Sequence, residues 1–134
     1  MENDIILNKS QIIERCIRRI HEEYGNNPDN LQNFTKQDSI ILNIQRACEA
    51  SIDLAMHLVA ENNLGIPQTS REAFDLLYQN NIISLALAEK LKAMVGFRNI
   101  AIHDYQAINL EIVRKIIEDH LKDLQEFTKT VLKL

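Results

Sequence analysis

The stretch that decides the fold is QDSIILNIQRACEASIDLAMHLVAEN, residues 37–62. Its apolar side chains recur at intervals of three and four residues, which is the spacing of one face of an α-helix. The pattern continues over about seven helical turns, and Thr35 stands where a helix cap is expected. We therefore predict a long central helix whose buried face is made by Ile40, Ile41, Ile44, Ala47, Cys48, Ser51, Leu54, Ala55, Leu58 and Val59.

The segment before this helix has the same helical spacing of apolar residues. It covers residues 5–24 and ends at Gly25, which accepts the left-handed conformation that often closes a helix. Pro28 follows shortly and cannot continue a helical hydrogen-bond ladder. We expect a first amphipathic helix over residues 5–24 and a loop from there to about Thr35.

The segment after the central helix divides into three further helices. Asn62, Asn63, Gly65 and Pro67 break the pattern, and a short helix capped by Thr69 or Ser70 is expected to run to about Gln79. Residues 84–99 and 109–132 give two more amphipathic helices. Because the connections are short, we predict an all-α, antiparallel helical bundle of four to five helices, with residues 1–134 as one domain.

The composition excludes several classes of protein. The net charge is −4, so the overall field does not attract nucleic acid or an anionic membrane, and any such site must be local. Three glycines and no glycine-rich loop rule out the Walker and Rossmann nucleotide folds. The longest charge-free apolar run, residues 82–88, is far shorter than the roughly 20 residues of a membrane span.

The two cysteines, Cys16 and Cys48, lie inside predicted helices and form no CxxC pair. The spacing therefore predicts neither a zinc site nor any other metal framework, and no cofactor is expected. No leader with a basic start and an apolar run precedes them. We expect reduced thiols and a cytoplasmic protein.

The most unusual string of the chain is RNIAIHDY, residues 98–105. It lies in residues 84–108, the one segment with a positive net charge, which contains three basic and two acidic residues. Arg98 can direct two donors onto a phosphate, and His103 can accept or donate a proton near neutral pH. Cleavage of RNA through its own 2′-hydroxyl needs this kind of pair, a base and a cation at the phosphoryl oxygens, and needs no metal.

The spacing of the two residues constrains such a site. Residues five apart on a helix differ by roughly 140°, so Arg98 and His103 do not share a face of one helix. We expect that the helix ends near Asn99, that His103 lies on a loop, and that a homodimer assembles the site from two chains. The alternative to a catalytic role is a structural one, in which Arg98 pairs with an acidic neighbour and His103 caps the helix end.

The order of these residues resembles the RNxxxHxY signature of the HepT family, a branch of the HEPN ribonucleases found as toxins in bacterial and archaeal toxin–antitoxin pairs. The resemblance covers roughly residues 5–130. It includes the segments at residues 43–46, 53–57, 65–67, 74–77 and 80–83. It implies a metal-independent endoribonuclease in which His103 is the general base, Arg98 holds the phosphate and Asn99 orients the phosphate or the arginine.

The resemblance also implies products, a partner and a modification. The products carry 2′,3′-cyclic phosphate and 5′-hydroxyl ends. The partner is an MntA-like nucleotidyltransferase antitoxin, which uses ATP and magnesium to transfer AMP onto the tyrosine of the motif, here Tyr105. An anionic AMP beside Arg98 and His103 fills the cleft and competes for the cation. The structural alternative for Tyr105 is an ordinary half-buried aromatic at the edge of the bundle.

Polar residues outside the motif allow more than one interpretation. Arg46, Glu49, Asp53 and His57 form one stripe on the central helix, in which Asp53 and His57 are close enough in sequence to bond. We interpret the stripe as structural, with contact to RNA or a partner as the alternative. Lys90, Lys92 and Arg71 are candidates for phosphate contacts, and the lack of tryptophan argues against a base-stacking platform.

A second hypothesis for the whole chain is a non-catalytic helical module. Such a module partners a nucleotidyltransferase and helps to hold its substrate, with Arg98 and His103 in structural or nucleotide-binding roles. Cleavage of RNA by the isolated chain, and its loss on His103→Ala, distinguishes the two hypotheses.

Overall fold

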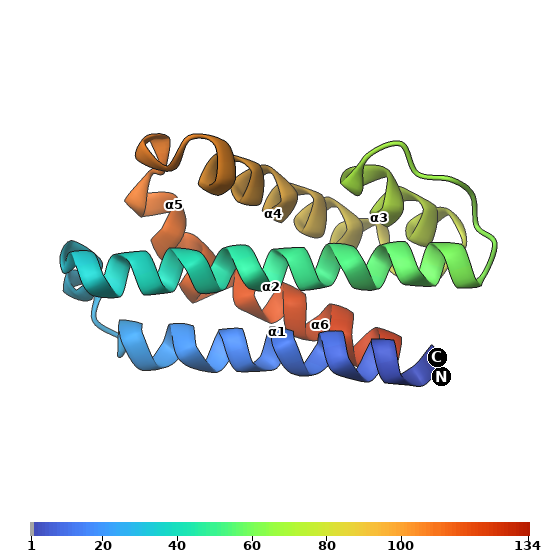
Figure 1. The fold of residues 1–134 in the computed structure, drawn as a ribbon, viewed down its shortest axis with the longest axis horizontal. Coiled ribbons are helices and arrows are strands. Elements are labelled where there is room, and N and C mark those ends of the chain that lie inside the picture. Colours follow the sequence, from blue (N-terminus) through green and yellow to red (C-terminus); the bar gives the residue numbers. More distant parts are fainter. Residues whose placement is uncertain (1) are drawn as a thin grey trace.

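The computed structural model describes residues 2–134 of the chain, which fold into a bundle of α-helices (Figure 1). Three short elements join or interrupt the helices: the 3₁₀ helices η1 (Pro28–Gln32) and η2 (Tyr105–Ala107), and the π-helical turn η3 (Ile116–His120). The predicted all-α bundle is confirmed. Its α-helices are α1 (Glu2–Tyr24), α2 (Phe34–Glu61), α3 (Ser70–Gln79), α4 (Leu85–His103), α5 (Leu110–Lys115) and α6 (Leu121–Leu132).

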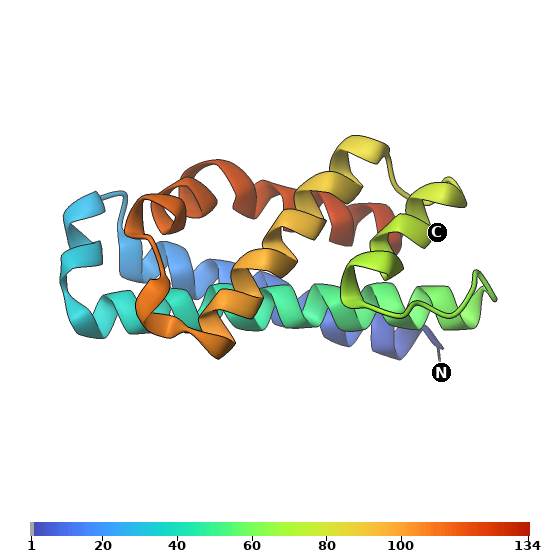
Figure 2. The same ribbon diagram turned by 90° about the horizontal axis from the view of Figure 1, so that it is seen from above.

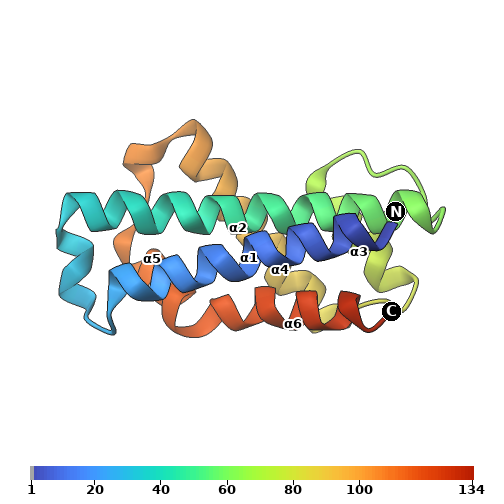
Figure 3. The same cartoon turned by 60° about the horizontal axis from the view of Figure 1, so that its bottom comes forward.

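The long helix α2 is the axis on which the other helices are arranged. Helix α1 runs antiparallel along it, and α6 packs against α1 and also contacts α2 (Figures 1 and 3). Helix α4 crosses α2 at an angle, with α3 packed near the start of that crossing (Figure 2). This crossing carries the end of α4 and the following η2 past the edge of α2, where they are exposed.

Asparagine residues occur at the ends and starts of several helices. Gly25, as predicted, and then Asn26 adopt positive φ angles after α1, and Asn63 and Asn81 do so shortly after α2 and α3. The side chain of Asn33 accepts a hydrogen bond from the backbone of Lys36 at 3.1 Å, and α2 therefore begins at Phe34.

The expectation that Thr35 caps the central helix is therefore wrong. Pro28 begins a 3₁₀ helix within the predicted loop, and the chain leaves it at Asn33 in an extended conformation suited to a cap. The cap predicted for the next helix is correct, because Thr69 accepts from the backbone of Glu72 at the start of α3. Ser84 accepts from the backbone of Leu87 at the start of α4, a cap not predicted from the sequence.

The core is a continuous cluster of buried aliphatic and aromatic residues drawn from all the long helices. Phe74 of α3 and Phe127 of α6 are both fully buried, and their rings meet edge to face with centroids 5.7 Å apart. Of the helices that the structure describes, none combines the length and the apolar character that a bilayer crossing needs.

The last predicted helix, residues 109–132, is interrupted by the π-helical turn η3. Near this turn the buried Tyr24 of α1 donates a hydrogen bond from its hydroxyl to the carboxylate of Glu118. A π turn inserts one extra residue into a helix, and hydrophobic spacing does not reveal such an insertion.

Candidate active site

Helix α4 carries Arg98, Asn99 and His103, and it continues through His103. The expectation that this helix ends near Asn99, with His103 on a loop, is wrong. Residues 100–102 contain no helix breaker, and Ala101 is buried in the core, so the last turn is anchored. The helix stops at Asp104, whose φ of −151° lies outside the helical range.

Because both residues are helical, Arg98 and His103 point in directions roughly 140° apart. The side chain of Arg98 is 19% exposed and turns toward α2 and α3. Its Nη2 atom lies 3.4 Å from the hydroxyl oxygen of Ser70, and its Nη1 atom lies 3.9 Å from the carboxylate of Glu49. Both contacts are at the long end of their range, so they hold the guanidinium loosely.

The Nε atom of Arg98 is buried and has no hydrogen-bond partner among the described residues. A buried donor without a partner is unfavourable for the protein alone and is satisfied when an acceptor enters the site. The acidic neighbour expected in the structural reading is present as Glu49. The guanidinium nevertheless keeps donors that can turn to a phosphate.

His103 is the last residue of α4 and is exposed. In the part of the chain that the structure describes, its ring nitrogens form no hydrogen bond or ion pair. An exposed, unengaged imidazole can accept a proton from a bound substrate.

Tyr105 lies in η2, directly after α4, and is 42% exposed. Its hydroxyl donates a hydrogen bond to the carboxylate of Asp38 on α2. Partial burial, this hydrogen bond and the negative charge of Asp38, in that order, raise the pKa of Tyr105 to about 12. The ring also borders a shallow hollow of about 290 Å³ with Gln37 and Leu110.

Tyr105 and Arg98 thus contact the same face of α2. Asp38 and Glu49 are eleven residues apart, which is three helical turns, or roughly 16 Å along the axis. Nothing in the sequence marks Asp38 or Ser70 as a partner of the motif, and Glu49 stands out there only as a member of the polar stripe.

The polar stripe on α2 does not act as one unit. Asp53 pairs with Lys9 of α1 at 3.1 Å, and His57 pairs with Glu61, one turn further along, at 2.7 Å. The bond considered between Asp53 and His57 is not formed, because each finds another partner. Glu49 is the member of the stripe that reaches the motif.

The three candidate cations outside the motif are engaged within the protein. Lys92 lies 2.9 Å from Asp75, a hydrogen bond that raises the pKa of Lys92, and it also lies 3.4 Å from Glu89. Arg71 donates to the backbone carbonyl of Lys92 at 3.3 Å, and Lys90 lies 3.8 Å from Asp123. Their contact with RNA phosphates stays a prediction.

Comparison with known proteins identifies relatives over nearly the whole chain. Residues 13–131 match the family described as Ribonuclease HepT-like. The mRNA nuclease HepT of Shewanella oneidensis is 53% identical over 129 residues, which are 96% of this chain and 97% of that protein.

Solved structures with the same fold include two toxin–antitoxin assemblies. A chain of a toxin–antitoxin crystal structure with AMP-PNP has a TM-score of 0.94 and 50% identity, over 98% of this chain and 99% of that one. A chain of the tri-AMPylated Shewanella oneidensis HEPN toxin in complex with MNT antitoxin has a TM-score of 0.93 and 51% identity, over 98% of each chain.

Proposed function

Because the chain belongs to the HepT-like ribonuclease family, we propose that it is a toxin that cleaves RNA with Arg98 and His103 as its catalytic pair. The observation that supports this most directly is the state of the two side chains. Arg98 has a buried Nε without a partner, and His103 is exposed with both ring nitrogens unengaged among the described residues. The ring of His103 is therefore available to a substrate hydroxyl, and the loosely held guanidinium of Arg98 can turn to the neighbouring phosphate.

The reaction follows from the chemistry of RNA. His103 accepts the proton of the 2′-hydroxyl, the 2′-oxygen forms a bond to phosphorus, and the bond from phosphorus to the 5′-oxygen breaks. The leaving 5′-oxygen takes up a proton, so the products are a 2′,3′-cyclic phosphate and a 5′-hydroxyl. Arg98 stabilises the charge on the phosphoryl oxygens, and Asn99 beside it orients the phosphate or the guanidinium. The nucleophile belongs to the substrate, so this step needs no metal.

The divergence of the two side chains favours a site shared between two chains. In a homodimer with a two-fold axis near the end of α4, the His103 of one protomer faces the Arg98 of its partner. Ile100 and Ile102, on the same turn of α4, are large aliphatic residues that are more than 40% exposed. Exposed apolar side chains beside a polar site are typical of an interface between chains.

Tyr105 is the proposed site of inhibition by AMPylation. The transfer joins its hydroxyl oxygen to the α-phosphate of ATP, with release of pyrophosphate and of the hydroxyl proton. The enzyme is a nucleotidyltransferase antitoxin of the MntA kind. The exposure of Tyr105 and the relative that is a tri-AMPylated HEPN toxin in complex with MNT antitoxin both support this assignment.

The physical effect of the modification is steric and electrostatic. Each added AMP places negative charge and a nucleoside beside the end of α4, where it blocks the cleft and competes with RNA for Arg98.

The cysteines Cys16 and Cys48 are both free and buried, as in a reducing compartment, and we place the protein in the cytoplasm.

The first experiment measures RNA cleavage in EDTA by the protein without its antitoxin. Wild type is compared with His103→Ala, Arg98→Ala and, as a matched control, Arg19→Ala on the exposed face of α1, away from the hollows beside that helix. We expect each site variant to lose roughly 10²–10⁴-fold in rate while keeping its circular dichroism spectrum, and the control to keep its activity. Equal background from wild type and both site variants would favour the non-catalytic module that holds a nucleotidyltransferase substrate.

The second experiment tests the modified residue. The chain is co-expressed with the nucleotidyltransferase and its mass is measured for wild type, Tyr105→Phe and Tyr78→Phe. Tyr78 is 39% exposed, so it controls for the accessibility of a tyrosine. AMP on wild type and Tyr78→Phe but not on Tyr105→Phe is expected. AMP retained on Tyr105→Phe contradicts the assignment.

A further inference from the structure

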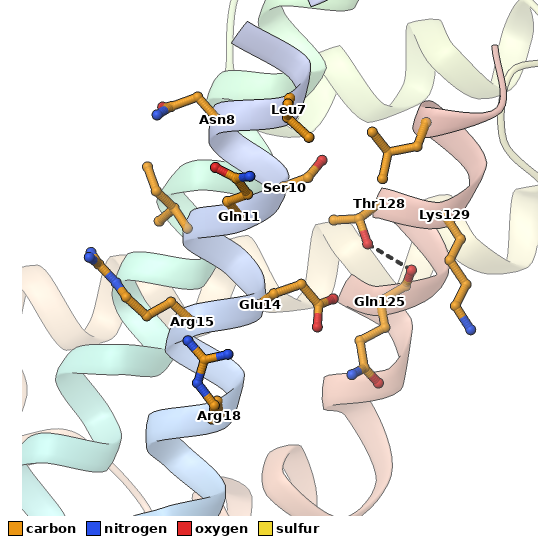
Figure 4. Close-up of a pocket in the computed structure, with 12 residues that line it drawn as sticks. Leu7, Asn8, Ser10, Gln11, Glu14, Arg15, Arg18, Gln125, Thr128 and Lys129 are labelled. Atoms are coloured by element: carbon orange, nitrogen blue, oxygen red, sulfur yellow. Dashed lines mark hydrogen bonds between the residues drawn. The ribbon is translucent and has the colours of Figure 1, made fainter. Parts of the chain in front are cut away.

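A groove of about 780 Å³ lies between α1 and α6 (Figure 4). None of Arg98, His103 and Tyr105 lines it, so it is separate from the proposed active site. A second hollow of about 510 Å³ continues it along α1 and shares Glu14, Arg18 and Gln125 with it. The two hollows together form an elongated, open surface along the helices.

Three cations line this groove without a partner. Arg15 and Arg18 come from α1, and Lys129 comes from α6 (Figure 4). Within residues 4–134, none of the three forms an ion pair, whereas Lys9, Lys90, Lys92, Arg98 and Arg114 all do. The first hollow also contains the carboxylate of Glu14, so its lining has an excess of two positive charges in a chain of net charge −4. Glu22 of the second hollow reduces the excess to one over both hollows.

A buried hydroxyl provides independent evidence for a ligand. Ser10 is only 3% exposed and lines the groove, and its side chain extends from α1 toward α6 (Figure 4). Among the described residues its Oγ atom has no hydrogen-bond partner. The nearby hydroxyl of Thr128 is already used, because it donates to the carbonyl of Gln125 at 2.9 Å. A buried hydroxyl without a partner is unfavourable until an acceptor reaches it.

The character of the lining indicates what the acceptor is. Neither hollow is lined by Phe or Tyr, so bases have no ring on which to stack. Cations, a hydroxyl and the amides of Gln11 and Gln125 match phosphate and ribose oxygens instead. An open groove that extends over two hollows suits a strand better than one compact molecule, which prefers an enclosed pocket.

We propose that the groove between α1 and α6 is a second RNA contact, which binds the sugar–phosphate backbone of the substrate away from the cleaved bond. This proposal rests on the proposed ribonuclease function, because it assigns the groove to that substrate. Arg15, Arg18 and Lys129 bind phosphates, and Ser10 donates to an oxygen of the backbone. Contacts of this kind add affinity without selecting a sequence.

The test measures binding of a labelled single-stranded RNA by fluorescence anisotropy in a His103→Ala background, so that the RNA is not cut. The groove variant is Arg15→Gln/Arg18→Gln/Lys129→Gln. The matched control, Arg19→Gln/Lys122→Gln/Lys133→Gln, removes the same charge from exposed residues of the same two helices or their ends that do not line the groove. Both are compared with the parent over a range of salt concentrations.

We expect the groove variant to bind RNA at least about tenfold more weakly than the control. Its plot of log affinity against log salt should also be shallower by about 2, since each phosphate contact with a single strand contributes about 0.7. Equal affinities and equal salt slopes for the two triple variants would overturn the proposal.

Two further measurements complete the test. Ser10→Ala should weaken RNA binding without lowering the thermal stability of the free protein, because it removes a hydroxyl that has no partner there. Unchanged RNA affinity in Ser10→Ala contradicts the role of that hydroxyl. AMP alone is the probe for a mononucleotide site, and binding of AMP that depends on the three cations while RNA affinity does not would overturn the assignment to RNA.

Failure of this proposal is distinguishable from failure of the ribonuclease function. The binding assay uses a variant designed not to cleave, and the cleavage assay with Arg98 and His103 variants leaves the groove intact. If the wild type cleaves RNA while both triple variants bind RNA equally well, only the RNA contact in the groove is refuted. If the wild type never cleaves RNA, the ribonuclease function is refuted.

Discussion

The hydroxyl of Tyr105 donates a hydrogen bond to the carboxylate of Asp38, 67 residues away in the sequence. This contact ties the short helix η2 to α2 at the edge of the candidate site. It holds the proposed AMP acceptor in its protonated form, because a neighbouring negative charge opposes formation of a phenolate. Any nucleotidyltransferase that modifies Tyr105 must therefore draw the hydroxyl away from Asp38 or pass its proton to that carboxylate.

Asp38→Asn is expected to lower the pKa of Tyr105 from about 12 toward the ordinary value of 10. Part of the shift remains, because burial is its largest cause and the substitution leaves burial in place. An NMR titration of ring-labelled tyrosine measures the change. Tyr24 is the internal control, since its pKa is also raised to about 12, by burial first and then by Glu118, and not by Asp38. An unchanged pKa at Tyr105 would contradict the hydrogen bond.

The same shift fixes the sign of a stability effect at high pH. The pKa of Tyr105 is higher in the folded protein than in the unfolded chain, so the folded state binds the proton more tightly. The stabilisation is complete below the ordinary pKa and is lost as the pH rises from about 10 to about 12. Asp38→Asn lowers the pKa of Tyr105 in the folded protein and so narrows the pH range over which this stability is lost.

Local sequence rules were sufficient for most of the fold. Apolar spacing predicted the long helices, and Thr69 caps α3 as its chemistry suggests. The failures occurred where the deciding interaction lies far away in the sequence or leaves no periodic signal. Helix α4 continues to His103 because Ala101 is buried against the core, and the π turn η3 inserts a residue that apolar spacing does not mark.

The candidate site shows the same division. Arg98 and His103 could be chosen from their chemistry and Tyr105 from the resemblance to the HepT signature, and the roles of all three stay predictions. Their partners Asp38 and Ser70 could not, because those contacts depend on where α2 and α3 lie in the folded protein. The groove between α1 and α6 likewise arises only from packing two distant segments side by side.

Tyr24→Phe is expected to destabilise the protein by about 1–3 kcal/mol near neutral pH, the usual worth of a hydrogen bond to a charged group. Tyr24 is buried, and its hydroxyl donates to the carboxylate of Glu118. This bond is the main reason that the pKa of Glu118 is lowered. Urea denaturation measures the free energy of unfolding, with Tyr78→Phe as the control for loss of an exposed tyrosine hydroxyl.

The penalty of Tyr24→Phe depends on pH with a definite sign. A depressed carboxylate pKa contributes stability above its ordinary value, and this stability is lost as the pH falls through the lowered pKa of Glu118. The difference between wild type and Tyr24→Phe should therefore shrink in acid. A difference that stays constant across this range would show that Glu118 is not the acceptor.

Phe127→Ala is expected to cost about 3–5 kcal/mol in unfolding free energy, because it opens a cavity at a fully buried site. The edge-to-face contact with Phe74 adds a coupling of about 0.5–1.5 kcal/mol, which a double-mutant cycle with Phe74→Leu measures. Phe34, 78% exposed at the start of α2, supplies the control. Phe34→Ala should change stability by less than about 0.5 kcal/mol, and a comparable loss in both variants would contradict the packing.

Two glycines should respond to alanine in opposite ways. Gly65 has a φ of +137°, which an alanine adopts only with strain, and a Cβ there lies 3.3 Å from Cδ2 of Leu76. We expect Gly65→Ala to lower the free energy of unfolding by about 1–3 kcal/mol. Chemical denaturation of both alanine variants under the same conditions gives the comparison.

Gly96 lies inside α4, where alanine is intrinsically favoured over glycine by about 1 kcal/mol. A Cβ at this position comes within 2.8 Å of Nη2 of Arg71, but that atom is the far end of a flexible side chain on α3 and can move. Its displacement weakens only the 3.3 Å hydrogen bond from Arg71 to the carbonyl of Lys92. Gly96→Ala should thus leave stability unchanged or raise it by up to about 1 kcal/mol, and a loss as large as that of Gly65→Ala would mean that Arg71 is fixed in place.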